Sequence, residues 1–199
     1  MALLDCSKLT TGYALEACTP PATPGTGARV ILLSYSDIDR AKSTMTDGVL
    51  STIVLKTGAQ GYEVDSMPDA TVGEVTFTAG TYLNSYGHQI TVRIFEKSEA
   101  AKKFGNNLLN ALVVAIVENK EHGDEGEVKY EVYGWGSGLK ISAITAATTM
   151  DDNTAYLYTL TTPSAGRENS LPVSIFNTDE ETTDAAVEAL LSPATDPEA

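Results

Sequence analysis

The chain has 199 residues, 42% of them hydrophobic, which is enough for one domain with its own core. Its 13 Lys and Arg residues stand against 27 Asp and Glu residues, a formal net charge of −14, which argues against a surface that binds nucleic-acid phosphates. No apolar run reaches the roughly 18 residues of a membrane span, and the longest candidate is NALVVAIVEN, so we expect no membrane contact.

The amino-terminal residues MALLDCSKLT lack a basic segment, and Asp5 interrupts their apolar residues, so we expect no cleaved export signal. The two cysteines, Cys6 and Cys18, are too few for a disulfide scaffold, and no Cys or His pair has the spacing of a zinc site. They are either two small buried side chains, the interpretation we prefer, or the ends of one local disulfide loop.

The first third of the chain predicts antiparallel strands. Three prolines and two glycines in residues 18–28 indicate a loop, and RVILLSYSDI (29–38) then has the composition of a buried strand. VLSTIVLK (49–56) and YEVDSM (62–67) follow as strands. The two glycines of TGAQG (57–61) between them predict a hairpin turn.

The middle of the chain changes its hydrophobic period. In GHQITVRIF, Ile90, Val92 and Ile94 fall on one face, as a half-exposed strand requires. Ser98 is then a plausible N-cap, and apolar residues at helical spacing predict a helix over about 98–110.

The helix is weakened by Gly105 and by the two asparagines that follow it. Beyond them, β-branched residues in ALVVAIVENK (111–120) favour a strand. The pattern here is therefore strand, helix, strand.

The last third begins with a polar turn, EHGDEGE, and continues with three strand candidates, VKYEVYGWG, LKISAIT and AYLYTLTT. After NSLPVSIF, the sequence carries seven acids and no base. We therefore expect one β-rich domain over residues 1–178 and an acidic, mobile tail over 179–199, with at best a short helix around DAAVEALL.

About nine strand segments against one clear helix, without strand–helix–strand alternation, predict a mainly β fold. The architecture expected is an antiparallel β-sandwich or barrel with one flanking α-helix.

A phosphate-binding loop needs a helix after its glycines, whereas YGWGSG is followed by LKISAIT, which alternates as a strand. Gly134, Gly136 and Gly138 are therefore interpreted as a tight bend or bulge in a hairpin, with Trp135 packed at the edge.

The remaining polar motifs predict no catalytic, cofactor-binding or metal-binding residue. The two histidines, His88 and His122, both lie beside glycine and are interpreted as exposed turn residues. The acidic clusters lack the ligand pattern of a calcium loop and are interpreted as solvated turns, MDDNTA (150–155) being the best candidate for a cation. No GxSxG elbow is present, so we expect no enzyme.

Four tyrosines fall on neighbouring strand candidates and offer a stacking surface for sugars or bases. Packing between strands is the commoner use of such residues, so glycan binding stays the lesser alternative. The four are Tyr130, Tyr133, Tyr156 and Tyr158.

The order of segments resembles the tail-tube and tail-ring proteins of bacteriophages that infect gut Bacteroidetes, including crAss-like phages. The similarity covers roughly residues 4–176, and the turn EHGDEGE and the acidic tail depart from it. It rests on Cys6, Gly12 and Cys18, the helix after RIFEK, the YGWGSGL bend, and the EN-LP motif near the end.

This resemblance implies a virion protein of the tail, made in the host cytoplasm, whose identical subunits form a closed ring around a DNA channel. Its expected partners are other copies of itself and neighbouring tail or portal-proximal proteins, with DNA as an unbound cargo. We expect loop 18–28 and segment 74–90 to reach onto neighbouring subunits and acidic residues to line the channel. The alternatives are a capsid decoration protein and a non-catalytic glycan-binding adhesin module.

Overall fold

The computed structural model describes residues 23–80, 83–146, 156–164 and 166–195. Among these residues, the helices lack the length and apolar character needed to cross a bilayer. The elements are β1 (Thr26–Ser34), a 3-10 turn (Tyr35–Asp37), β2 (Thr44–Thr46), β3 (Val49–Thr52), β4 (Tyr62–Asp65), β5 (Val72–Thr78), β6 (Ser85–Ile94), α1 (Glu99–Leu108), β7 (Val113–Asn119), β8 (Tyr130–Tyr133), β9 (Lys140–Ala146), β10 (Tyr156–Thr161), β11 (Val173–Ile175) and α2 (Glu180–Ala189).

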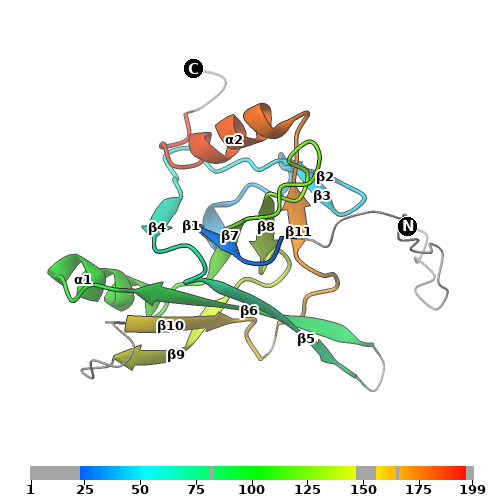
Figure 1. Cartoon of the computed structure of the whole chain (residues 1–199). Helices are drawn as coiled ribbons and strands as arrows, with labels where there is room; N and C mark the ends of the chain where they lie inside the picture. The colour runs from blue at the N-terminus through cyan, green and yellow to red at the C-terminus, as the bar shows by residue number, and fades with distance from the viewer. Residues whose placement is uncertain (1–22, 81–82, 147–155, 165, 196–199) are drawn as a thin grey trace.

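The strands form two sheets, which confirms the expected mainly β, sandwich-like fold. One sheet has seven strands in the order β2-β3-β11-β8-β7-β1-β4, and the other has four in the order β5-β6-β10-β9. Figure 1 shows the four-stranded sheet at the bottom of the molecule, the seven-stranded sheet above it and α2 at the top. The fold therefore has three layers.

The seven-stranded sheet is buried on both faces. In β1, Val30 and Leu32 pack into the core between the sheets, while Ile31 and Leu33 pack into a second core beneath α2. β7 alternates in the same way, and five of its residues in succession are buried. A strand between two apolar layers is hydrophobic at every position, which explains the unbroken apolar runs of β1 and β7.

The flanking helix predicted over about 98–110 is confirmed as α1. The hydroxyl of Ser98 accepts a hydrogen bond from the amide of Ala101, so Ser98 is the N-cap. Gly105 does not break the helix, because it lies against the ring of Tyr158, where a Cβ would come within 2.4 Å of the hydroxyl oxygen. Glycine serves here for close packing of α1 on β10.

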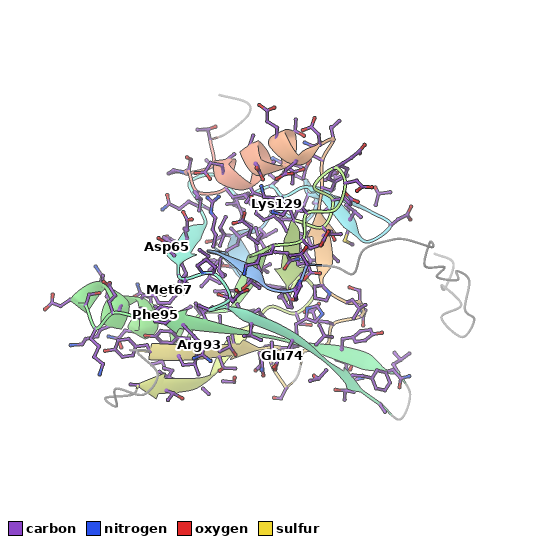
Figure 2. The ribbon with its side chains drawn as sticks, in the orientation of Figure 1. Asp65, Met67, Glu74, Arg93, Phe95 and Lys129 are labelled. Carbon is purple, nitrogen blue, oxygen red and sulfur yellow. The ribbon has the colours of Figure 1, made fainter. Side chains whose placement is uncertain are left out.

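Residues 180–189 form helix α2, which differs from the expected mobile tail. Val187 and Leu190 are 1% and 7% exposed and belong to the second core. Lys129, labelled in Figure 2, lies beneath the helix, and its amino group is 2.9 Å from Glu180 and 2.7 Å from Asp184. The expectation that this segment adds little to the fold is corrected, because it covers one face of the larger sheet.

The hairpin expected at residues 57–61 is wrong. β3 and β4 lie near opposite ends of the seven-stranded sheet, where β3 pairs with β2 and, in parallel, with β11. The amides of Gly58 and Gly61 donate to the carbonyls of Ala194 and Leu190 instead. The glycine-containing segment therefore docks on the chain that follows α2.

Segment 74–90 falls within the antiparallel hairpin of β5 and β6, which extends beyond the rest of the sheet (Figure 1). Phe77 and Leu83, toward its end, are 63% and 71% exposed. The proline-rich loop is shorter than expected, because Thr26 already belongs to β1, and residues 18–22 lie outside the described part. Contact of either segment with a neighbouring subunit stays a prediction.

Candidate functional site

The glycine stretch forms a tight turn, as predicted, but it is not a hairpin. Gly134 and Gly138 have φ angles of +75° and +74°, and the amide of Gly138 donates to the carbonyl of Gly134 at 2.8 Å. The strands on either side, β8 and β9, belong to different sheets. The turn is thus a crossover between the two layers, and its positive φ angles explain two of its three glycines.

This turn holds an anion supplied by the chain itself. The carboxylate of Glu168 accepts hydrogen bonds from the amides of Gly136 at 2.8 Å and Ser137 at 2.7 Å. Glu168 is 2% exposed, and its backbone pairs with Tyr86 of β6. Converging amides of this kind favour negative charge. The amides of this turn are therefore occupied by a glutamate of the same chain.

His88 lies beside this turn and is only 2% exposed, so its interpretation as an exposed turn residue is wrong. Its Nδ1 accepts a hydrogen bond from the amide of Gly134 at 3.1 Å, which leaves Nε2 to donate to the carbonyl of Ser170 at 3.0 Å. Both contacts require the neutral ring protonated at Nε2. Burial lowers the pKa of His88, against the opposing influence of the Ser170 carbonyl and the Glu168 carboxylate.

His122 lies apart from His88, and its Nδ1 is 3.0 Å from the carboxylate of Glu180 on α2. The described residues contain no group of three or more His, Cys, Asp or Glu arranged to hold a metal ion. Cys6, Cys18 and the whole MDDNTA segment lie outside those residues. The sequence-based expectations about the two thiols and about a cation in that segment therefore stay predictions.

The four tyrosines do not form a row. Tyr130 and Tyr133 are on β8 in the seven-stranded sheet, whereas Tyr156 and Tyr158 are on β10 in the four-stranded sheet. Tyr130, Tyr133 and Tyr158 are buried, and burial raises the pKa of each phenol. Their rings pack inside the protein and do not offer a stacking surface for a sugar.

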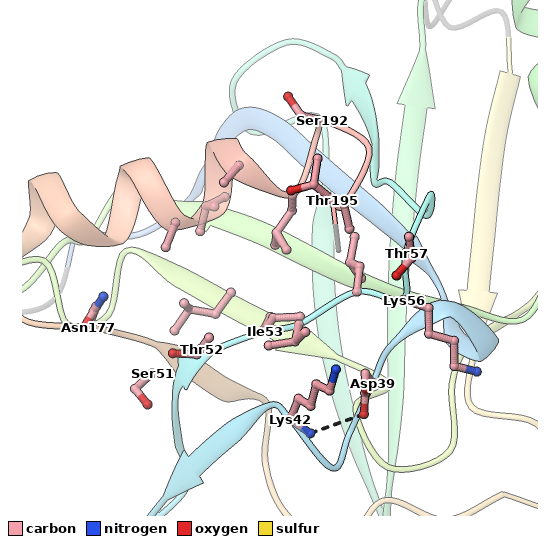
Figure 3. Close-up of a pocket in the computed structure, with 18 residues that line it drawn as sticks. Asp39, Lys42, Ser51, Thr52, Ile53, Lys56, Thr57, Asn177, Ser192 and Thr195 are labelled. Carbon is pink, nitrogen blue, oxygen red and sulfur yellow. Dashed lines mark hydrogen bonds between the residues drawn. The ribbon is translucent and has the colours of Figure 1, made fainter. Parts of the chain in front are cut away.

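A cavity of about 630 Å³ lies between the end of α2 and residues 51–57 (Figure 3). Its walls include aliphatic side chains such as Ile53 and Leu190, and its charged residues are Asp39, Lys42 and Lys56. The Lys56 amino group donates to the carbonyl of Ser36 at 2.6 Å. Aliphatic and hydroxyl groups with these few charges assign no reaction to the cavity.

The most distinctive surface feature is the pair of edges of the four-stranded sheet. β5 and β9 are both seven residues long and largely exposed, and no described strand pairs with their outer sides. Each carries a single charged residue, Glu74 on β5 and Lys140 on β9. The edges of the larger sheet, β2 and β4, have only three and four residues.

Long edges with few charges are templates for pairing with another strand, and soluble proteins ordinarily shorten, charge or cover them. In the described residues, β5 and β9 are neither short nor covered, and each carries only one charge. We therefore regard these two edges as the candidate functional site.

Comparisons of the chain with known protein families, curated proteins and solved structures gave no match in any of the three.

Proposed function

We propose that this protein is a bacteriophage virion structural protein whose identical subunits form a closed ring of the tail around the DNA channel. The observation that carries the proposal is the pair of open edges, β5 and β9, at the two ends of one small sheet. The phage tail and the DNA channel in this proposal rest on the resemblance in segment order.

The strand directions allow the sheet to continue from one subunit to the next. Each neighbouring pair in the order β5-β6-β10-β9 is antiparallel, so β5 and β9 run in opposite directions. When β9 of one copy lies beside β5 of the next, that pair is antiparallel too, and every copy repeats the same contact. Glu74 and Lys140, one on each edge, have opposite charges.

A contact between two different surfaces of the same protein produces either a ring that closes or an open filament. A ring satisfies both edges of every subunit, so no strand is left to pair with an unrelated protein. The projecting β5–β6 hairpin (Figure 1) suits this arrangement, because it carries the β5 edge away from the body of its own subunit. The proposed assembly thus uses both edges at once.

Cross-linking between the edges tests the proposal. In a chain with Cys6→Ser and Cys18→Ser, we would place Thr76→Cys on β5 and Ala143→Cys on β9 and treat the protein with a flexible bismaleimide. The double variant should give a ladder of covalent multimers that ends at one closed species, since each contact joins β5 to β9.

The two single variants are the matched controls, and neither should form covalent multimers. Dimers from one single variant would show a symmetric contact and contradict the ring. A chain that stays monomeric, or one that assembles without any β5–β9 cross-link, would also overturn the proposal. A capsid decoration protein would bind the shell and form no ring alone.

A further inference from the structure

The outer face of the four-stranded sheet is a sheet face on which no described helix or strand packs. Its inner face packs on the first core, through His88 and Ile90 of β6 and Tyr158 and Leu160 of β10, among others. The strand register then assigns the alternate residues to the outer face. These are Val72, Glu74, Thr76, Thr78, Ser85, Gly87, Gln89, Thr91, Arg93, Lys140, Ala143, Thr145, Leu157, Thr159 and Thr161.

Threonine is the commonest residue on this face, and the charges nearly balance. Glu74 is its one acid, and Arg93 and Lys140 are its two bases. Figure 2 labels Glu74 and Arg93 on the four-stranded sheet. The Glu74 carboxylate also accepts a hydrogen bond from the side-chain Nε2 of Gln89 at 2.6 Å, which holds it against the sheet.

Two described segments on the opposite side of the molecule are rich in acidic residues. Helix α2 and its cap carry Asp179, Glu180, Glu181, Asp184 and Glu188, and Figure 1 places α2 at the top, away from the four-stranded sheet. The charged turn between β7 and β8 adds Glu121, Asp124, Glu125 and Glu127. Among the described residues, these two segments carry nine acids, whereas the outer face of the four-stranded sheet carries one.

We infer that the threonine-rich outer face of the four-stranded sheet lines the channel and that the acidic α2 side faces outward. This inference rests on the proposed ring and replaces the acidic lining expected from the sequence. If β5 and β9 pair between subunits, the four-stranded sheets join into one wall, and that wall has the threonine face on one side and the rest of each subunit on the other. The side that carries the other layers needs more room, so it belongs on the outside of a closed ring.

The chemistry of this face suits a passing double-stranded DNA. A hydrogen bond from a threonine hydroxyl to a phosphate replaces a hydrogen bond to water. Its net free energy is therefore small, and threonines alone do not hold the DNA in place. Tight binding of DNA depends on many Lys or Arg contacts to phosphates, whereas each subunit adds only two bases and one acid to this face. A wall with this sparse, slightly positive charge holds the DNA weakly and does not repel it.

Labelling of cysteines in assembled rings tests which face lines the channel. In the Cys6→Ser, Cys18→Ser background, Thr159→Cys marks the threonine face and Glu181→Cys, on α2, is the matched exterior control. Each assembled protein is treated with a small maleimide and, separately, with a maleimide on a dextran too large to enter the channel. Dissociated subunits show that both cysteines can react with both reagents.

In intact rings, Thr159→Cys should react with the small maleimide and resist the large one, while Glu181→Cys reacts with both. Equal reaction of Thr159→Cys with both reagents would place the threonine face outside and overturn this inference while the ring itself stands. Resistance of Thr159→Cys to both reagents would show a buried contact and overturn it too. If the unlabelled parent chain forms no ring, the proposed function fails first, and that result is read from the particle mass before any labelling.

Discussion

The carboxylate of Glu168 and the backbone amide of Gly136 are 2.8 Å apart, and this contact joins two segments that lie 32 residues apart in the sequence. Gly136 belongs to the turn that crosses from the larger sheet to the smaller one, and Glu168 follows β10 of the smaller sheet. The hydrogen bond therefore fixes the position of one layer on the other. In the proposed ring, neighbouring subunits meet through the edges of the smaller sheet, so the ring depends on how this sheet is held against the larger one.

Removal of the Glu168 carboxylate should destabilise the fold. Glu168→Ala leaves the amides of Gly136 and Ser137 without their acceptor in a partly buried place, which should lower the free energy of unfolding by about 0.5–1.5 kcal/mol for each lost bond. Glu168→Gln keeps one carbonyl oxygen and should lose less. Urea denaturation followed by the fluorescence of Trp135, which lies in the same turn, measures both. The exposed Glu125→Ala is the control, and an equal loss there would contradict the role given to Glu168.

The buried His88 should make the protein less stable in mild acid. Burial lowers the pKa of His88 in the folded state, so below its unfolded pKa of about 6.5 the unfolded chain binds more protons than the folded chain. The free energy of unfolding should therefore be highest above pH 6.5 and fall as the pH drops from there toward the folded-state pKa.

Urea denaturation at pH 7.5 and pH 5.5 checks this expectation. His88→Asn, which cannot take up a proton in this range, should lose less stability between the two pH values than the native chain. An unchanged pH dependence in His88→Asn would show that the buried ring is not responsible.

Gly105→Ala should destabilise the protein although alanine is the better helix former. In an exposed helix the change is worth about 1 kcal/mol in favour of alanine. Here the added methyl group would meet the ring of Tyr158, and overpacking of this kind costs about 1–3 kcal/mol. Asn106→Ala, at the next and exposed position of α1, should stabilise slightly. A stabilising Gly105→Ala, measured by thermal unfolding, would contradict the close contact of α1 with β10.

Helix α2 should be necessary for stability. Leu190→Ala removes a side chain that is 7% exposed in the second core and should cost about 2–5 kcal/mol. Leu109→Ala, at a residue that is 58% exposed, should change the free energy of unfolding by less than about 0.5 kcal/mol. Truncation after Asn177 removes the whole helix and should prevent stable folding. A truncated chain with native thermal stability would restore the view of this segment as a tail.

The sequence predicts well the elements whose pattern is local. The alternation of Ile90 and Val92 identifies β6, and Ser98 marks the start of α1, because spacing and capping are properties of neighbouring residues. A short helix around DAAVEALL is expected from the sequence, but the packing of α2 on the larger sheet is missed, because its acids have no base nearby in the sequence and Lys129 comes from 51 residues away. Charge pairing across such a distance leaves no local signal.

Strand partners and the interior polar contacts are non-local in the same way. The glycines at 58 and 61 indicate a turn but not which strands lie beside it, and β3 pairs with β11 from the far end of the chain. His88 beside a glycine looks like a turn residue, and only the fold shows that it accepts a hydrogen bond from Gly134. The edges β5 and β9 likewise become a candidate site only when the strand order is known.

The most direct test of the ring is the mass and shape of the purified full-length chain. Light scattering should give a single assembly whose mass is an integer multiple of the 21.0 kDa subunit, and negative-stain images should show closed rings with a central opening. A protein that stays monomeric at high concentration, or that forms only symmetric dimers, would contradict the account.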